Sequence, residues 1–508
     1  MKGKKIVSTL LVLLLLASLP VSAHAAVWDV GKGDITISAG SGGQTVTQGD
    51  GAAVEDSAPV ITGSSTENTV TINAEKDQTA SVTLSGANID VSGAGKAAVS
   101  TTGNGNVSIE LDGDNTLKSG KGHAGLEKNN GGSLTIADEN KNGKLTAEGG
   151  KYGAGIGGGD QGAGSDITIT GGEVNATGGQ YGAGIGGGKG DGSDITISGG
   201  EVNATGGTSG AGIGGGYNGN GSDITITDGE VNATGGKYGA GIGGGEYGIG
   251  KDIIITGGEV NATGGRFSAG IGGGSRGTGS DITISGGEVN ASGGVNGAGI
   301  GGGLRSKGKD ITVSGDTKLK VQGGDEDHYD GAGAGIGDGG SNAYGTKILG
   351  AEVEPDTSGL TTGRIEYYAP GADMDKDAPS QTIVGTYIPP QPAREAAARA
   401  QPTAPLYRVT DGDGKDVSYE TTWRDGVLAV TVEADRAVLT GRLSSIASLQ
   451  AQGIERIVFI TKGATSEFLT ADLLAAAPAT ERYALTHDGE TVTFTAGEAD
   501  VSGILVKA

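Results

Sequence analysis

Apolar and polar residues alternate in short runs through the middle of the chain, and the runs recur at a nearly fixed interval. In the run at residues 166–170 the apolar residues are Ile167 and Ile169, with threonine after each. Alternation with a period of two is typical of β-strands that bury one face. Glycine pairs separate the runs, and glycine at this density disfavours helix. Each repeat therefore predicts three short strands, as at residues 153–157, 166–170 and 173–177.

The phrase Ala-Gly-Ile marks each repeat. Its isoleucine recurs at intervals of 29, 28, 29, 29 and 29 residues, at Ile156, Ile185, Ile213, Ile242, Ile271 and Ile300. A fixed period in this range indicates a repeat architecture. Three strands that each stack on their counterparts in the next repeat predict a right-handed parallel β-helix with about 29 residues per coil. Equivalent residues then form columns at a spacing of roughly 4.8 Å.

The same pattern divides the chain into segments. The predicted β-helix covers residues 26–370, with six regular coils in residues 151–324 and degenerate coils on either side. Six prolines fall within residues 371–405, which predicts a linker of moderate stiffness. Residues 406–508 predict a separate small α+β domain, in which we expect one of the helices at residues 468–477.

The N-terminus has the features of a secretory signal peptide at residues 1–25. Lys2, Lys4 and Lys5 precede an apolar run at residues 6–17, and small residues follow. This run is too short for an ordinary membrane span. We therefore expect a secreted or extracellular protein that associates with the cell surface or is released, with no membrane insertion after the signal is removed.

Composition and charge limit the partners. The chain has 106 glycines among 508 residues, no cysteine and a formal net charge of −24. Removing the signal segment takes away three lysines and no acid, which moves the net charge from −24 to −27. Such an acidic surface argues against nucleic acid and anionic membranes as partners. It would tolerate or attract divalent cations.

Several short sequence motifs within residues 60–320 resemble those of a known family. These motifs stand at residues 82–89, 107–117, 132–136 and 153–158. Their sequences resemble those of the secreted carbohydrate-binding parallel β-helix domain of clostridial and other Gram-positive bacteria, a solenoid similar to pectate lyase. The resemblance implies non-catalytic binding of a polysaccharide or glycan, sometimes with calcium. It transfers no catalytic residue.

Two acidic columns follow from the repeat. An aspartate opens the first long strand of successive coils, at Asp166, Asp194, Asp223, Asp252, Asp281 and Asp310, and a glutamate opens the second, at Glu173, Glu201, Glu230, Glu259 and Glu288. Like charges one rung apart repel by about 1 kcal/mol in water. The aspartates could accept backbone N–H groups in the turn. Alternatively, the first five could bind a cation such as calcium between rungs.

Two neutral polar columns have structural interpretations. Stacked amides predict a hydrogen-bonded ladder at Asn175, Asn203, Asn232, Asn261 and Asn290. Outward threonines also form rows, and flat threonine arrays are similar to those of ice-binding proteins. Threonine is in any case a favourable outward residue in a strand, and Ile254 interrupts one row. Ice binding therefore remains an alternative function.

A further column stands immediately before the glycine-rich strand and is mostly aromatic. Its members are Tyr152, Tyr181, Ser209, Tyr238, Phe267 and Asn296. Four of the six are aromatic in a chain with only 4% aromatic residues, and alternate glycines beside them predict a strip without side chains. Such rings could stack on sugar rings, or on one another to shield the turn. The candidate glycan platform is therefore Tyr152, Tyr181, Tyr238 and Phe267.

Enzymatic chemistry has no clear constellation in the sequence. Outside the signal segment the histidines are His123, His328 and His487, and no column combines a base, a nucleophile and a partner. We expect a non-enzymatic carbohydrate-binding or adhesin-like protein. One alternative is a structural stalk that presents the C-terminal domain, and another is a polysaccharide lyase with an irregular site at residues 328–330.

Overall fold

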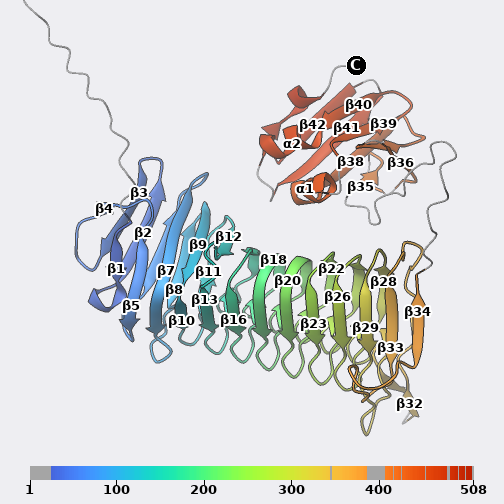
Figure 1. The fold of residues 1–508 in the computed structure, drawn as a ribbon, viewed down its shortest axis with the longest axis horizontal. Helices are drawn as coiled ribbons and strands as arrows, with labels where there is room; N and C mark the ends of the chain where they lie inside the picture. The colour runs from blue at the N-terminus through green and yellow to red at the C-terminus, as the bar shows by residue number, and fades with distance from the viewer. Residues whose placement is uncertain are drawn as a thin grey trace, which may run out of the picture.

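The computed structural model describes residues 25–343, 346–385 and 407–505, apart from residues 413, 416, 425, 452, 453, 478–480, 490 and 498. Within it, a parallel β-solenoid of about 14 turns with about 29 residues per turn precedes a small C-terminal unit (Figure 1). The predicted solenoid is confirmed. The predicted signal segment, up to residue 24, lies outside the described residues.

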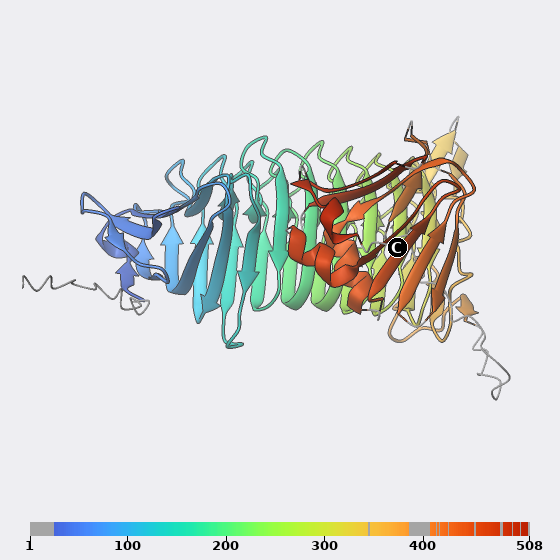
Figure 2. The same ribbon diagram turned by 90° about the horizontal axis from the view of Figure 1, so that it is seen from above.

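One regular coil contains three strands, as the alternation predicted. They are β14 (Ile156–Gly157), β15 (Gly164–Ile169) and β16 (Glu173–Thr177). Each pairs in parallel with its counterpart in the next coil, so that Ile156 lies opposite Ile185. The short Ile-Gly strands belong to a 13-stranded sheet, and both longer types belong to a 19-stranded sheet. Two long sheets therefore form the walls of the solenoid. Figure 2 shows strands lying side by side along its length.

The remaining regular coils repeat this arrangement. In two of them the longer strands merge into β18 (Gly192–Thr205) and β20 (Gly221–Thr234), with a register shift near Ser198. The other strands are β17 (Ile185–Gly186), β19 (Ile213–Gly214), β21 (Ile242–Gly243), β22 (Gly250–Ile255), β23 (Glu259–Thr263), β24 (Ile271–Gly272), β25 (Gly279–Ile284), β26 (Glu288–Ser292), β27 (Ile300–Gly301), β28 (Gly308–Val313) and β29 (Lys318–Gln322).

The N-terminal coils are less regular, and their first sheet edge is covered. β2 (Ile35–Gly40) and β3 (Gly43–Gln48) pair antiparallel, and β4 (Val54–Glu55) pairs antiparallel with β3. This meander covers the edge of β2, and the 13-stranded sheet ends in the two-residue strand β4, which offers little backbone for further pairing. The other elements are β1 (Val27–Asp29), η1 (Val30–Lys32), β5 (Val60–Ser65), β6 (Val70–Ala74), β7 (Thr79–Asp90), β8 (Val99–Gly103), β9 (Asn106–Asp112), β10 (Asp114–Lys118), β11 (Leu126–Lys128), β12 (Leu134–Ala137) and β13 (Lys144–Glu148).

The solenoid continues beyond the predicted boundary at residue 370. β34 (Gln381–Val384) pairs antiparallel with β33 (Arg364–Tyr368), which itself stacks on β29. The prediction of a linker over residues 371–405 was therefore wrong for this part, because the antiparallel return covers the last edge. The rest of that linker, residues 386–405, lies outside the described residues. The final coils also contain β30 (Ile336–Gly337), β31 (Ser341–Ala343) and β32 (Thr346–Ile348).

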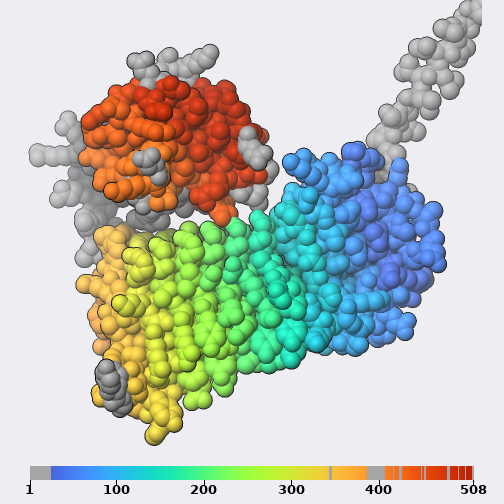
Figure 3. Space-filling model, turned by 180° about the vertical axis from the view of Figure 1, so that it is seen from behind, coloured from blue at the N-terminus to red at the C-terminus, as the bar shows by residue number. Residues whose placement is uncertain are grey.

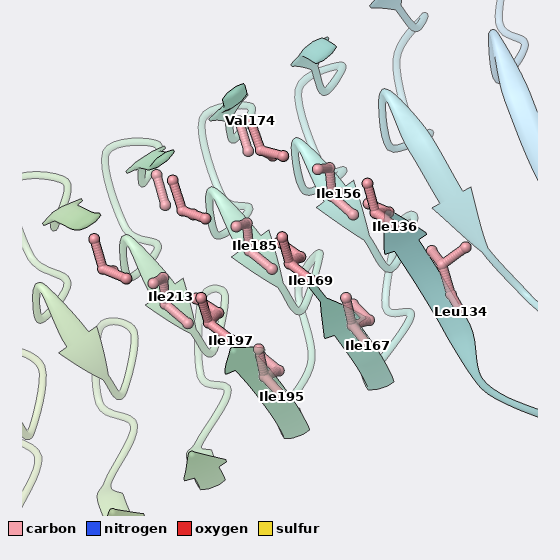
Figure 4. Packing of buried hydrophobic residues seen from close by; sticks show 14 of the residues in the cluster. Leu134, Ile136, Ile156, Ile167, Ile169, Val174, Ile185, Ile195, Ile197 and Ile213 are labelled. Carbon is pink, nitrogen blue, oxygen red and sulfur yellow. The ribbon is translucent and has the colours of Figure 1, made fainter. Parts of the chain in front are cut away.

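Aliphatic columns fill the solenoid core, because each strand turns its apolar residues inward. In one coil Ile156, Ile167, Ile169 and Val174 are 0% exposed and Ala176 is 1% exposed. Figure 4 shows the isoleucines of this coil stacked on those of the next, at Ile185, Ile195 and Ile197. Full burial of one such isoleucine or valine contributes roughly 1.5–3 kcal/mol.

The C-terminal unit has its own apolar core. One sheet is antiparallel, in the order β35-β38-β41-β42-β43, and the other has the order β36-β37-β39-β40, with β37 and β39 parallel. No helix among the described residues is long and apolar enough to span a membrane. The elements are β35 (Arg408–Thr410), β36 (Glu420–Arg424), β37 (Val427–Thr431), β38 (Arg436–Arg442), α1 (Leu443–Ala451), β39 (Arg456–Ile460), β40 (Thr465–Leu469), α2 (Thr470–Ala476), β41 (Arg482–Asp488), β42 (Thr491–Ala496), β43 (Ala499–Asp500) and η2 (Ser502–Ile504).

The predicted helix at residues 468–477 begins later than expected. Phe468 lies in β40, opposite Ile457 of β39, and is fully buried. Strand pairing and burial of the phenylalanine outweigh the local helical pattern at this point. The helix α2 starts at Thr470, whose hydroxyl group donates to the carbonyl oxygen of Ile454 at 3.1 Å.

We predict that charge in the core destabilises the solenoid far more than charge on its surface. Ile213→Asp places an unpaired carboxylate among buried isoleucines and should cost about 3 kcal/mol or more. Thr205→Asp, at an exposed position in the preceding coil, is the control and should change stability little. Thermal unfolding followed by circular dichroism measures both, and equal effects would contradict the inward and outward assignment.

We predict that the C-terminal unit loses stability in mild acid through His487. This residue is fully buried, with ring nitrogens 3.0 Å from the Thr461 hydroxyl and 2.8 Å from the Ser466 hydroxyl. Burial lowers the pKa of His487 from its ordinary value of 6.5 to about 4. The unfolded state therefore binds a proton that the folded state does not, and stability falls as the pH drops from 6.5 to about 4. NMR titration of the ring in the folded protein tests this, and a pKa near 6.5 would refute it.

Candidate functional site

The aromatic column lies at the turns that lead into the glycine-rich strands. Tyr152 and Tyr181 stack with ring centroids 5.3 Å apart and planes 14° from parallel. Tyr238 and Phe267 stack at 5.9 Å and 11°. These spacings follow the distance between neighbouring parallel strands, roughly 4.8 Å. The four predicted platform residues thus form two stacked pairs.

Two further tyrosines join this surface, although the sequence prediction did not include them. Tyr217 packs edge to face against Tyr181 at 5.6 Å, and Tyr247 packs edge to face against Tyr217 at 6.2 Å. We call the surface formed by Tyr152, Tyr181, Tyr217, Tyr238, Tyr247 and Phe267 the aromatic edge. Tyr247 is 46% exposed, and the other five rings are half-buried.

The position of Tyr217 comes from a second column in the loop that follows the glycine-rich strand. The backbone N–H group of Tyr217 donates to the carbonyl oxygen of Tyr181 at 2.8 Å. Corresponding bonds of 2.8–2.9 Å link Glu246 to Ser209, Ser275 to Tyr238, and Leu304 to Phe267. This loop column could have been found by aligning the residues that follow each Gly-Gly-Gly sequence.

Cationic side chains surround the aromatic edge. Lys151 and Lys189 each place Nζ 5.3 Å from the centre of the Tyr152 ring. Lys237 lies over Tyr238 at 4.9 Å, and Arg266 lies over Phe267 at 4.9 Å. Cation–π contacts at exposed sites contribute about 0.5–1 kcal/mol each. This edge therefore carries a local concentration of positive charge in an acidic protein.

The predicted bare glycine strip is not a surface. Gly153, Gly155 and Gly157 are buried between coils. A Cβ atom at Gly182 would overlap the carbonyl oxygen of Gly153 in the preceding coil. The prediction of an open strip was wrong because the missing side chains make room for backbone of the neighbouring rung. Any ligand of the rings would lie against their outer faces and the loops.

The aspartate column is a feature of the turn. All six aspartates from Asp166 to Asp310 have left-handed backbone angles, with φ between 54° and 56°. Aspartate tolerates this region better than most residues. Among the described hydrogen bonds, none runs from a backbone N–H group to these carboxylates, so the predicted N–H acceptor role was wrong. The backbone conformation accounts for the residue type.

Cations from the protein itself lie beside this column. Lys251 is 3.1 Å from Asp252, and Lys309 is 3.1 Å from Asp310. The hydrogen bond to Asp252, with the charges of Asp252, Asp223 and Asp281, raises the pKa of Lys251. Arg442 of the C-terminal unit contacts Asp194. Within the described part of the chain, no group of three or more His, Cys, Asp or Glu residues could hold a metal ion, which gives the calcium candidates Asp166, Asp194, Asp223, Asp252 and Asp281 no ligand set.

The predicted asparagine ladder is confirmed. Each side-chain amide donates to the Oδ1 atom of the preceding rung, at distances of 2.7–3.0 Å from Asn203 to Asn290. The adjacent glutamate column is paired at its two ends, by Lys144 with Glu173 at 2.6 Å and by Lys318 with Glu288 at 3.7 Å. The hydrogen bond from Lys144 lowers the pKa of Glu173. These columns support the stack.

The candidate residues for lyase chemistry have structural partners. Arg305 holds Asp330 through two hydrogen bonds of 2.8 and 3.0 Å, and Asp330 is 4% exposed. His328 packs edge to face on Tyr329 at 4.7 Å.

The third histidine-containing contact lies in the coil before the regular repeats. There Glu127 Oε2 lies 2.8 Å from His123 Nδ1 and accepts the backbone N–H of Ala124 at 3.0 Å. Carbonyl oxygens accept this N–H group in the regular coils, so Glu127 replaces one of them.

Comparison with known proteins supports the repeat. A family model described as a beta helix repeat matches residues 141–160, 167–189, 195–217, 224–246, 253–275 and 282–304. The chain is a β-helix repeat protein. Each matched stretch ends in the loop column beside the aromatic edge. No curated protein and no solved structure matches the chain significantly.

Proposed function

We propose that this β-helix repeat protein is a non-catalytic carbohydrate-binding protein of the adhesin type, and that the aromatic edge is its glycan platform. The observation that carries the proposal is the row of half-buried rings along one edge, with two stacked pairs at 5.3 and 5.9 Å. Sugar rings have apolar C–H faces, and aromatic rings are the side chains best suited to cover them.

The geometry suits an extended polymer. Within each stacked pair the rings follow the solenoid axis at the spacing of the coils, and the Ser209 rung separates the two pairs. Units of one chain could therefore contact rings on several rungs. Each contact is weak, but contacts on one rigid support add without a fresh cost of association. Space-filling in Figure 3 shows the coils as adjacent bands along the molecule, which is the kind of continuous support that this binding mode requires.

The cations around the rings supply polar contacts. Lys151, Lys189, Lys237 and Arg266 could donate to hydroxyl or carboxylate oxygens at the margin of the platform. The aspartate and glutamate columns lie on strands of the 19-stranded sheet. The four cationic residues lie instead in the turns and loops on either side of the glycine-rich strands. Secretion or surface location is part of this proposal and rests on the signal-like segment. The net charge of −24 supports a partner other than nucleic acid.

A second candidate function is a structural stalk that presents the C-terminal unit. The near-parallel stacking of the rings on one another, at 14° and 11°, favours it, because mutual stacking would also shield the turns. The separate apolar core of the C-terminal unit fits a module carried on a support. The two candidates differ in whether the outer ring faces contact a ligand.

We predict that the double variant Tyr181→Ala and Tyr238→Ala loses glycan binding while the fold survives. Loss of two ring contacts of about 1 kcal/mol or more each should weaken retention about tenfold or more. The double variant Thr196→Ala and Thr225→Ala truncates outward residues on the other wall and is the control. A glycan array identifies ligands of the native chain, and retention on insoluble polysaccharide measures the variants.

Two results would contradict the proposal. The first is a native chain that binds nothing on a broad array of plant, host and bacterial cell-wall glycans. The second is unchanged retention of the ring variant together with a lowered melting temperature, which would assign the rings to the stalk function.

A further inference from the structure

The aromatic column has two gaps, and the structure treats them differently. Asn296 is 0% exposed, and its amide donates to the carbonyl oxygens of Asp330 and Gly331 at 3.1 and 2.8 Å. The insertion that carries Asp330 therefore covers this gap. Ser209 occupies the other gap, between the rungs of Tyr181 and Tyr238. There the missing ring leaves a hollow of about 490 Å³.

We propose that the hollow at Ser209 is a specificity-determining subsite that takes one uncharged sugar unit, whose hydroxyl groups donate to Glu246. This inference rests on the proposed glycan platform and assigns a selective position within it. Tyr181, Tyr217 and Tyr238 contribute rings to the walls, and Ser209 and Glu246 contribute polar atoms.

The spacing of the walls suits a single ring. Tyr181 and Tyr238 stand two rungs apart, which corresponds to roughly 9.6 Å between equivalent backbone positions. Stacked rings elsewhere on this edge stand one rung apart and touch each other, at 5.3 and 5.9 Å. A unit inserted at Ser209 would thus occupy the place of the ring that the column lacks.

Glu246 is a fixed hydrogen-bond acceptor in this hollow. Its Oε2 atom accepts the Ser209 hydroxyl at 2.8 Å, and its backbone N–H group donates to the Ser209 carbonyl oxygen at 2.8 Å. Ser209 is 4% exposed, so it forms the floor. The other carboxylate of the loop column, Asp160, lies at a different rung and pairs with Lys189 at 3.8 Å, so Glu246 is the loop-column carboxylate at the Ser209 rung.

The charge of Glu246 determines which sugar fits. A carboxylate accepts hydrogen bonds from hydroxyl groups strongly, because the bond is charge-assisted. The same carboxylate repels the carboxylate of a uronic acid at short range. Lys189 also lines the hollow, and its charge repels a cationic sugar. An uncharged sugar satisfies both conditions.

The test fills the gap and neutralises the acceptor in separate variants of the full chain. Ser209→Tyr inserts the ring that the column lacks, and Glu246→Gln keeps the shape but removes the charge. Thr205→Tyr adds a ring at an exposed position on the other wall, at the end of the preceding coil, and is the control. Affinity electrophoresis measures binding to two neutral soluble probes, xyloglucan and mixed-linkage β-glucan, and to polygalacturonate. Melting temperatures verify the folds.

The subsite predicts that Ser209→Tyr weakens binding to a neutral probe at least tenfold, that Glu246→Gln weakens it about tenfold, and that the control does neither. If the Tyr181 and Tyr238 variants lose binding but Ser209→Tyr keeps it, the subsite is wrong and the platform stands. If Glu246→Gln tightens binding to polygalacturonate and leaves neutral binding unchanged, the assignment to an uncharged sugar is overturned. If ring and gap variants all bind like the native chain, the proposed function itself fails.

Discussion

The structure depends on direct contact between the glycine backbones of successive coils. At the turn before each Ile-Gly strand, a Cβ atom would overlap a carbonyl oxygen of the preceding rung, as at Gly207 over Gly179 and at Gly236 over Gly207. Backbone hydrogen bonds hold the coils together at the same place, as where the N–H group of Gly207 donates to the carbonyl oxygen of Gly182 at 2.9 Å. Because the loops are held at the strand spacing, the residue that precedes each turn is placed in register with its neighbours, and the aromatic edge follows.

In-register stacking also places identical side chains next to each other on neighbouring rungs. The energetic consequence differs from column to column. Amides gain from it, because every Asn from Asn203 to Asn290 donates to its neighbour at 2.7–3.0 Å. Glutamates are paired by lysines only at the two ends of their column. The aspartates are set by their left-handed backbone, and Lys251 offsets part of their charge. The aromatic rings gain contact area. The two columns that stack with a net attraction are thus the amides and the rings.

Residues that repeat at a fixed offset were predictable from sequence, because the coil converts period into position. The burial of Ile167 and Ile169, the asparagine ladder and the stacking of Tyr152 on Tyr181 all follow from this rule. Tyr217 and Tyr247 were missed because their rings reach the edge through loop contacts between coils. The open glycine strip was a wrong expectation, since the sequence shows that Gly182 lacks a side chain but not that Gly153 backbone occupies the space. The helix start at Thr470 depended on pairing between β39 and β40.

The most direct test of this account is the effect of one methyl group at a turn glycine on thermal stability. Gly207→Ala should lower the apparent melting temperature of the solenoid by at least about 5 °C, because its Cβ atom would overlap the Gly179 carbonyl oxygen. Gly42→Ala, where a Cβ atom would meet nothing within 4 Å, should leave it unchanged. Equal melting temperatures for the two variants would contradict the claim that backbone contact at the glycine turns fixes the register of the coils and places the rings.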